Sequence, residues 1–172
     1  MRTIGVSIAV PAPCGVQLQD YRVALGDDAA RLIPTHVTLL PPYDVEDDVE
    51  AAVRIYLQRA ASSHRPFRVH LRGTGTFRPV SPVVFVGVVE GISQCEQLAT
   101  SVRDGPFELS ATFPYHPHVT VAHHLDEKLM DRAFAELASF ECEFEVDRFW
   151  LYEQDPQLGW RASCSYELSD LG

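Results

Sequence analysis

Residues 35–40 read Thr-His-Val-Thr-Leu-Leu, and residues 115–123 read Tyr-His-Pro-His-Val-Thr-Val-Ala-His. Both stretches hold a His-Val-Thr tripeptide followed by an aliphatic residue, beginning at His36 and at His118. The composition of the chain predicts roughly 0.3 His-x-Thr matches by chance, so one copy alone would mean little. Two copies that share a central valine indicate a duplicated structural unit.

The hydrophobic pattern around the tripeptides supports this duplication. In each half, a predicted strand is followed by a helix, the His-x-Thr strand, a second helix and a further strand. In the first half these elements are expected at 4–10, about 15–30, 35–40, 44–63 and 67–71. In the second half they are expected at 83–89, 91–103, 116–123, 126–137 and 140–146, with two more strands at 148–152 and 160–168.

The Gly-, Pro- and Ser-containing segment 72–82 is predicted to connect the two halves. Because the repeat is too long for a solenoid, we expect one domain of two pseudo-symmetric lobes, approximately 1–75 and 80–172, that face each other.

Strand geometry gives the tripeptides a chemical meaning. Side chains at i and i+2 point to the same face of a strand, so His36 and Thr38 should project together, as should His118 and Thr120. If the lobes meet about a pseudo-twofold axis, two imidazoles and two hydroxyls converge on one cleft. One imidazole can then act as a base and the other as an acid, while the hydroxyls donate to phosphate oxygens. This chemistry requires no metal and no cofactor.

The doubled His-Val-Thr motif with aliphatic tails resembles the signature of the 2H phosphoesterases, the superfamily of 2′-5′ RNA ligase-like proteins and RNA cyclic phosphodiesterases. The resemblance covers essentially the whole chain. It implies an α+β fold that is bilobal and internally duplicated, with two antiparallel sheets around a central cleft and helices on the outside. It also implies hydrolysis of a 2′,3′-cyclic phosphate, or of another cyclic or 2′-linked phosphodiester. His36 and His118 would be the acid–base pair, in an order that the sequence leaves open, and Thr38 and Thr120 would hold the phosphoryl oxygens.

Further residues are candidates for contact with substrate. Tyr43 and Tyr115 flank the motifs and could stack on a nucleobase or simply pack against the protein. His116 is expected at the rim of the cleft, since Pro117 marks the entry to a strand.

In a straight strand His116 and His124 share the face of His118, and His123 points away. A metal site built on these histidines is a minor alternative. Phe77 and Phe149 are expected in the core. Strand parity does not single out a phosphate-binding arginine, and the candidates are Arg68, Arg78, Arg148 and Arg161.

The bulk composition limits the partners. The formal net charge of −10 disfavours binding to long nucleic acids and favours a small nucleotide or the phosphate at an RNA end. The four cysteines lack the spacing of a zinc site, and no apolar stretch is long enough to span a membrane, so a cytoplasmic protein is expected. The oligomeric state is left open, with a monomer as the default.

Three other interpretations remain at this stage. The cleft could bind nucleotides or RNA ends without turning them over, it could catalyse 2′-5′ ligation, or the chain could be a scaffold with a degenerate site. The last is the weakest, because all four motif residues are present.

Overall fold

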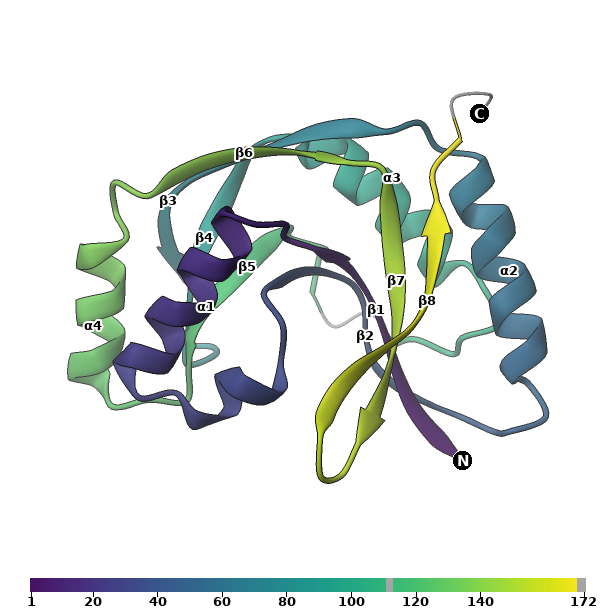
Figure 1. The fold of residues 1–172 in the computed structure, drawn as a ribbon, viewed down its shortest axis with the longest axis horizontal. Coiled ribbons are helices and arrows are strands. Elements are labelled where there is room, and N and C mark those ends of the chain that lie inside the picture. The colour runs from purple at the N-terminus through teal and green to yellow at the C-terminus, as the bar shows by residue number, and fades with distance from the viewer. Residues whose placement is uncertain (111–112, 170–172) are drawn as a thin grey trace.

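The computed structural model describes residues 1–110 and 113–169. This part of the chain forms two four-stranded antiparallel sheets with α-helices on the outside (Figure 1), which confirms the predicted α+β class. In chain order the elements are β1 (Arg2–Ala9), α1 (Cys14–Leu25), the 3-10 helix η1 (Asp28–Leu32), β2 (His36–Val45), α2 (Glu50–Ser62), β3 (Phe67–Thr76), β4 (Val83–Glu90), α3 (Ile92–Arg103), β5 (His118–His123), α4 (Glu127–Glu136), β6 (Glu141–Val146), β7 (Arg148–Asp155) and β8 (Gly159–Glu167).

The two sheets share one design. The first has the strand order β2-β1-β7-β8 and the second has the order β5-β4-β3-β6. In both, the motif strand lies at an edge and the strand that opens its half of the chain lies next to it. Position by position, β5 therefore corresponds to β2, β4 to β1, and β3 to β7.

The sheets do not divide the chain at the predicted connector. β3, from the first half, pairs with β4 and β6 in the second sheet, and β7 and β8 complete the first sheet. The predicted lobe boundaries therefore do not coincide with those of the sheets. Hydrophobic periodicity identifies a strand but not its partners, because pairing is decided by long-range contacts.

The helices cross between the sheets as well. α1 packs on β5 of the second sheet, and α3 packs on β2 of the first. α4 covers the second sheet and α2 lies along β8, so these two helices mark opposite ends of the molecule in Figure 1. Each motif strand is therefore covered by a helix from the other half of the sequence.

Two strands run further than the sequence predicted. β3 continues to Thr76 through the expected connector, and Gly73 absorbs a positive φ of 74° where its register with β4 shifts. β2 continues through Pro41 and Pro42, which had been expected to end it. Proline is tolerated here because β2 is an edge strand and its pairing with β1 is irregular at this point.

The same β-bulge follows the threonine of each motif. Thr38 pairs with Ser7 and Leu40 pairs with Val6, which leaves Leu39 as the extra residue. In the other sheet Thr120 pairs with Phe85 and Ala122 pairs with Val84, which leaves Val121 extra. In each strand the extra residue and its successor are both buried, so the strand reverses its face after the bulge.

The core is formed by apolar side chains from both sheets and from the inner faces of the helices. The largest fully buried ones include Phe149, Ile8, Leu18, Leu57, Leu98 and Met130. Phe149 is in the core, as predicted. No helix in the described residues is long and apolar enough to cross a membrane.

The β7–β8 turn packs closely on η1. Gly159 has a φ of 76°, and a Cβ atom there would overlap the backbone of Leu32. Gly26, after α1, has a φ of 101°, but a Cβ atom there would meet nothing within 4 Å. Both glycines thus adopt a positive φ, but only Gly159 has no room for a side chain.

We expect Gly159→Ala to destabilise the fold more than Gly26→Ala. Gly26→Ala should lower the free energy of unfolding by about 1 kcal/mol through backbone strain alone. Gly159→Ala adds overpacking against η1, which costs about 1–3 kcal/mol more. Urea denaturation of both variants checks this, and equal losses would contradict the close packing of the turn.

Candidate active site

The two motif strands approach each other across the two sheets. β2 and β5 are edge strands of different sheets, and they contact one another. His36 and Thr38 are half-buried on one strand, as are His118 and Thr120 on the other, whereas Val37 and Val119 are fully buried. The alternation of faces predicted for both tripeptides is therefore present, on edges that face a common space.

Each motif histidine is fixed in the same way. His36 Nδ1 donates to the backbone oxygen of Pro34 at 2.5 Å, and His118 Nδ1 donates to that of His116 at 2.7 Å. In both cases the acceptor lies two residues before the histidine. A carbonyl acceptor requires a proton on Nδ1, so Nε2 is the nitrogen left to exchange a proton with a ligand.

The surroundings of both imidazoles favour the neutral form. Burial lowers the pKa of His36 from 6.5, the bond to Pro34 opposes this, and the charge of Arg22 lowers the pKa further. Burial also lowers the pKa of His118, the bond to His116 opposes it, and positive charge on His116 or His36 lowers it further. The two imidazoles are thus close enough for the charge of one to act on the other, as an acid–base pair requires.

A cavity of about 750 Å³, measured with its open mouth, lies along the first sheet. One part is polar and contains His36, Thr38, Thr120, Arg22 and His123. The hydroxyls of Thr38 and Thr120 make no hydrogen bond to any of the described residues, so they are free to donate to a ligand.

Another part of the cavity is apolar. It is lined by Tyr152 and Trp160, with Gly5 beneath the indole ring. Gly5 pairs with Tyr152 across β1 and β7, two residues from Ser7, which pairs with Thr38. The aromatic part therefore continues directly from the motif along the same face of the sheet.

His118 is surrounded by aromatic rings, and neither it nor these rings are among the described residues that line this cavity. The ring of Phe77 meets that of His118 edge-on with centroids 4.9 Å apart, and Phe85 lies 5.3 Å from His118. His116 contacts the same two phenylalanines. Phe77 was predicted to be in the core, but it is only partly buried and packs on the motif histidine.

His123 belongs to the site, although a straight strand would turn it away. The bulge at Val121 shifts the parity of β5, so His123 lines the cavity together with Thr120. His124 follows with a φ of 53° outside the strand. A bulge cannot be inferred from the alternation of polar and apolar residues, which is why the sequence suggested the opposite.

Arg22 is the arginine of the cavity, and the sequence did not suggest it. Its side chain is 3% exposed, and Nη2 and Nε donate to Asp27 Oδ2 at 2.7 and 3.3 Å. The four arginines suggested by the sequence do not line the cavity. Three of them form ion pairs with carboxylates elsewhere: Arg68 with Glu143, Arg78 with Asp131, and Arg148 with Asp147 and Glu167. Arg22 lies four residues after Leu18 and three before Leu25, both buried in α1, and this helical spacing was the available signal for its inward position.

The two tyrosine hydroxyls are used within the protein. Tyr115 donates to the backbone oxygen of Thr38 at 2.8 Å, and its ring lies 4.9 Å below the guanidinium of Arg103, which donates to the oxygen of Leu39. These bonds satisfy carbonyls at the bulge of β2. Tyr43 accepts a bond from the backbone nitrogen of Glu108 at 3.0 Å. Stacking of either ring on a nucleobase stays a prediction.

In the described residues no group of three or more His, Cys, Asp or Glu side chains is placed to hold a metal ion. The histidines of β5 therefore do not form such a cluster with acidic or thiol groups. The four cysteines are free thiols.

Comparison with known proteins places this arrangement in a family. The profile of the 2′-5′ RNA ligase superfamily matches residues 10–157, most of the chain. The chain belongs to this superfamily. It is 29% identical over 156 residues to a protein of Oceanobacillus iheyensis named "Putative phosphoesterase OB1230", covering 88% of this chain and 91% of that one. A protein of Bacillus cereus strain AH820 with the same description is 27% identical over 139 residues, 80% of each chain.

Solved structures of other proteins share the fold. Escherichia coli LigT, crystallised with 3′-AMP, superposes with a TM-score of 0.72 at 20% identity, covering 98% of this chain and 99% of that one. A Thermus thermophilus protein superposes with a TM-score of 0.68 at 21% identity, covering 99% and 100%. The overall fold of this chain is thus one that these solved structures share over nearly their whole length.

We expect the motif histidines to make stability depend on pH. Because their folded-state pKa values lie below 6.5, the unfolded chain binds more protons at mildly acid pH, and the free energy of unfolding falls as pH decreases below about 6.5. His36→Asn removes one such group, so its loss of stability between about pH 7 and 5 should be shallower than that of the unmodified protein. Urea denaturation across this range measures it, with His124→Asn as the control. An unchanged slope in His36→Asn would contradict the lowered pKa.

We expect Tyr115→Phe to weaken the support of β2. The change leaves the Thr38 carbonyl without its donor in a partly buried place, which costs about 1–2 kcal/mol in the free energy of unfolding. Tyr43→Phe is the matched control, because its bond to Glu108 is exposed and its loss should cost a few tenths, on the order of 0.5 kcal/mol or less. Equal effects would argue against a bracing role of Tyr115.

Proposed function

We propose that the protein is a metal-independent phosphodiesterase that hydrolyses a 2′,3′-cyclic phosphate, or another cyclic or 2′-linked nucleotide phosphodiester, with His36 and His118 as the acid–base pair. The observation that carries this proposal is that the histidine and threonine of both motifs have the same hydrogen-bonding arrangement. Each histidine has Nδ1 bonded to the carbonyl two residues before it, and each threonine hydroxyl is free and lines one cavity. Membership of the 2′-5′ RNA ligase superfamily and the phosphoesterase relatives support it.

The chemistry follows from this geometry. A phosphate held between the motifs accepts hydrogen bonds from Thr38 and Thr120 on its non-bridging oxygens. A water molecule attacks phosphorus, and Nε2 of one histidine takes its proton. The bond from phosphorus to the ribose oxygen on the far side breaks, and Nε2 of the other histidine gives that oxygen a proton. The product is a phosphate monoester, and the two imidazoles have exchanged roles.

The lowered pKa values suit this reaction. One imidazole must be neutral to act as a base, and its burial favours that form. An anionic phosphate between the rings stabilises a proton on the other imidazole, which is thereby available as the acid. Binding of the substrate would therefore leave one imidazole neutral and the other protonated.

The predicted partner is a small nucleotide. Solved structures of Escherichia coli LigT contain 3′-AMP and ATP, and the cavity here combines a polar part with an aromatic part. A nucleobase on Tyr152 and Trp160 would leave its ribose phosphate at the motif.

We expect His36→Asn and His118→Asn each to lower kcat on nucleoside 2′,3′-cyclic phosphates by about 10²–10⁴-fold. Asparagine retains a donor near the position of Nδ1 but has no group that can act as Nε2 does. Turnover is measured by liquid chromatography in the presence of EDTA, with His124→Asn as the matched control. The double variant should lose little more than either single variant, since the pair acts as a unit.

The proposal is wrong if either histidine variant keeps full activity, or if chelation alone abolishes turnover. Tight nucleotide binding without turnover over a broad panel would favour the binding-protein interpretation instead. Products with new 2′-5′ linkages would favour ligation.

A further inference from the structure

Arg22 and His123 place two nitrogen-bearing side chains at the polar part of the cavity, outside the motifs themselves. Arg22 comes from α1 and His123 from the end of β5, and both line the cavity. The bulge after Thr120 is what brings His123 to this face. These two residues have no role in the proposed acid–base reaction.

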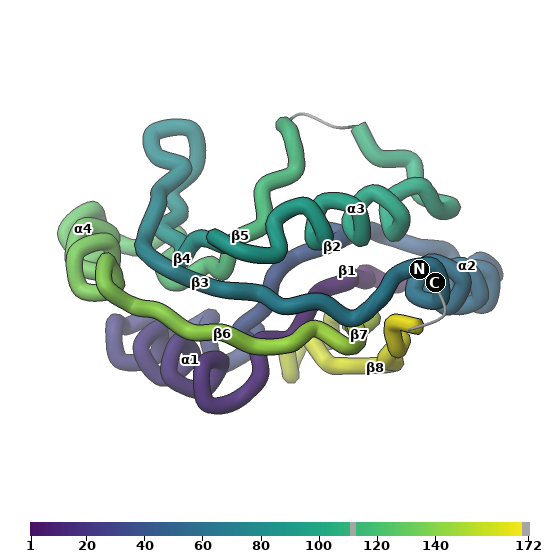
Figure 2. Tube along the Cα trace, turned by 90° about the horizontal axis from the view of Figure 1, so that it is seen from above, coloured from purple at the N-terminus to yellow at the C-terminus, as the bar shows by residue number. Residues whose placement is uncertain are grey.

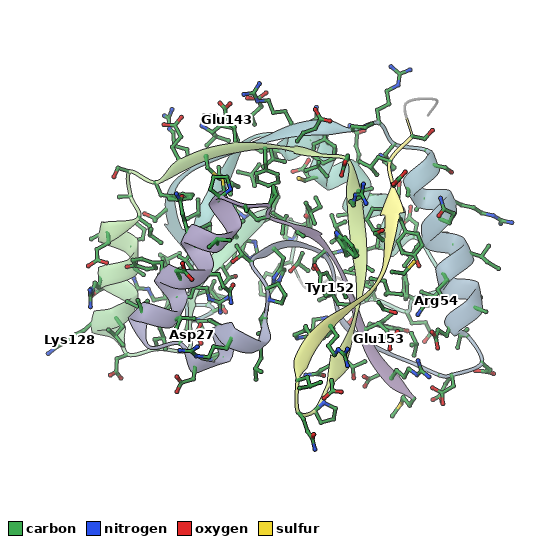
Figure 3. All side chains as sticks on the ribbon, in the orientation of Figure 1. Asp27, Arg54, Lys128, Glu143, Tyr152 and Glu153 are labelled. Carbon is green, nitrogen blue, oxygen red and sulfur yellow. The ribbon has the colours of Figure 1, made fainter. Side chains whose placement is uncertain are left out.

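The arginine is held in a fixed orientation. Asp27, which is 5% exposed, accepts from both Nε and Nη2 of Arg22 through one oxygen, while Nη1 takes part in neither bond. Figure 3 shows Asp27 just after α1, away from Tyr152 on β7. A buried guanidinium is costly unless its donors are used, and the part of it that meets the cavity can be used by an anionic ligand.

The position of this pair differs from that of the reacting phosphate. In the pairing of β5 with β4, His118 lies opposite Gly87, Thr120 opposite Phe85 and His123 opposite Val83. His123 therefore lies beyond Thr120 along β5, on the side away from His118, and Arg22 lines the cavity together with His123 whereas His118 does not. A ligand with one phosphate between the motifs could therefore place a second anionic group at Arg22.

Resting on the proposed function, we propose that Arg22 and His123, with Arg22 oriented by Asp27, bind a second phosphate of the substrate, the one attached to the 5′ oxygen of the nucleoside whose 2′,3′ end lies at the motifs. The substrate class is then a nucleotide phosphorylated on both sides of its ribose, and not a simple nucleoside cyclic phosphate. Such a phosphate can be a terminal monoester or the diester that links the last nucleotide of an RNA to its neighbour.

Binding of product analogues tests this without relying on turnover. Calorimetry compares 3′-AMP, adenosine 3′,5′-bisphosphate and the dinucleotide ApAp, which carries a 3′-phosphate. The bisphosphate should bind at least about tenfold more tightly than 3′-AMP, the worth of one charge-assisted hydrogen bond. In Arg22→Gln and in His123→Asn this ratio should fall toward one.

Matched variants separate the local effect from loss of charge. Arg59→Gln removes an exposed arginine on α2 that does not line the cavity, and should keep the ratio. An equal gain for ApAp identifies an RNA end as the source of the second phosphate, and a gain confined to the bisphosphate identifies a 5′-monophosphate.

Two results would overturn the proposal: no preference of the unmodified protein for either doubly phosphorylated ligand, or a preference that survives both Arg22→Gln and His123→Asn. Since His123 is exposed, its variant remains informative if loss of the buried ion pair prevents folding of the other. Absence of hydrolysis by the unmodified protein would overturn the proposed function alone, because these affinities do not depend on turnover.

Discussion

The contact between the edge strands β2 and β5 is the constraint on which the rest of the site depends. Each strand uses one edge to pair within its own sheet and turns the other toward its counterpart. The His-Val-Thr motifs of the two strands can therefore meet while the hydrogen bonding within each sheet stays intact. β3 from the first half of the chain belongs to the second sheet, and β7 from the second half belongs to the first sheet. The helices α1 and α3 also pack on strands of the other half. These contacts hold the two sheets, and with them the two motifs, in one arrangement.

The β-bulges refine this contact. An extra residue after each threonine turns two consecutive side chains into the core and changes the face of all that follow. In β5 this change brings His123 to the cavity. In β2 the same position is Pro41, so the two half-sites are equal at the motif and different three residues later. The asymmetry fits a reaction in which one phosphate is bracketed symmetrically but the remainder of the ligand extends to one side.

Tertiary contacts also support each motif from outside its own half. Tyr115 and Arg103 come from the segment that leads into the second motif, yet they bond to carbonyls of the first motif strand. Arg22 comes from the first half and acts beside His123 of the second. Figure 2 shows α3 of the second half lying beside β2 of the first. Residues from both halves of the chain therefore contribute to the surroundings of each motif.

The sequence by itself determined the motif residues, the duplicated order of strands and helices, and the fold class, because these follow from local periodicity and from a tripeptide that places His and Thr on one face. The extension of β2 past Pro41, the exchange of strands between sheets, the inward position of Arg22 and the presence of His123 in the cavity were decided by the tertiary structure. Strand pairing, bulges and buried ion pairs depend on which segments meet in space, and a one-residue shift in pairing reverses every side chain beyond it.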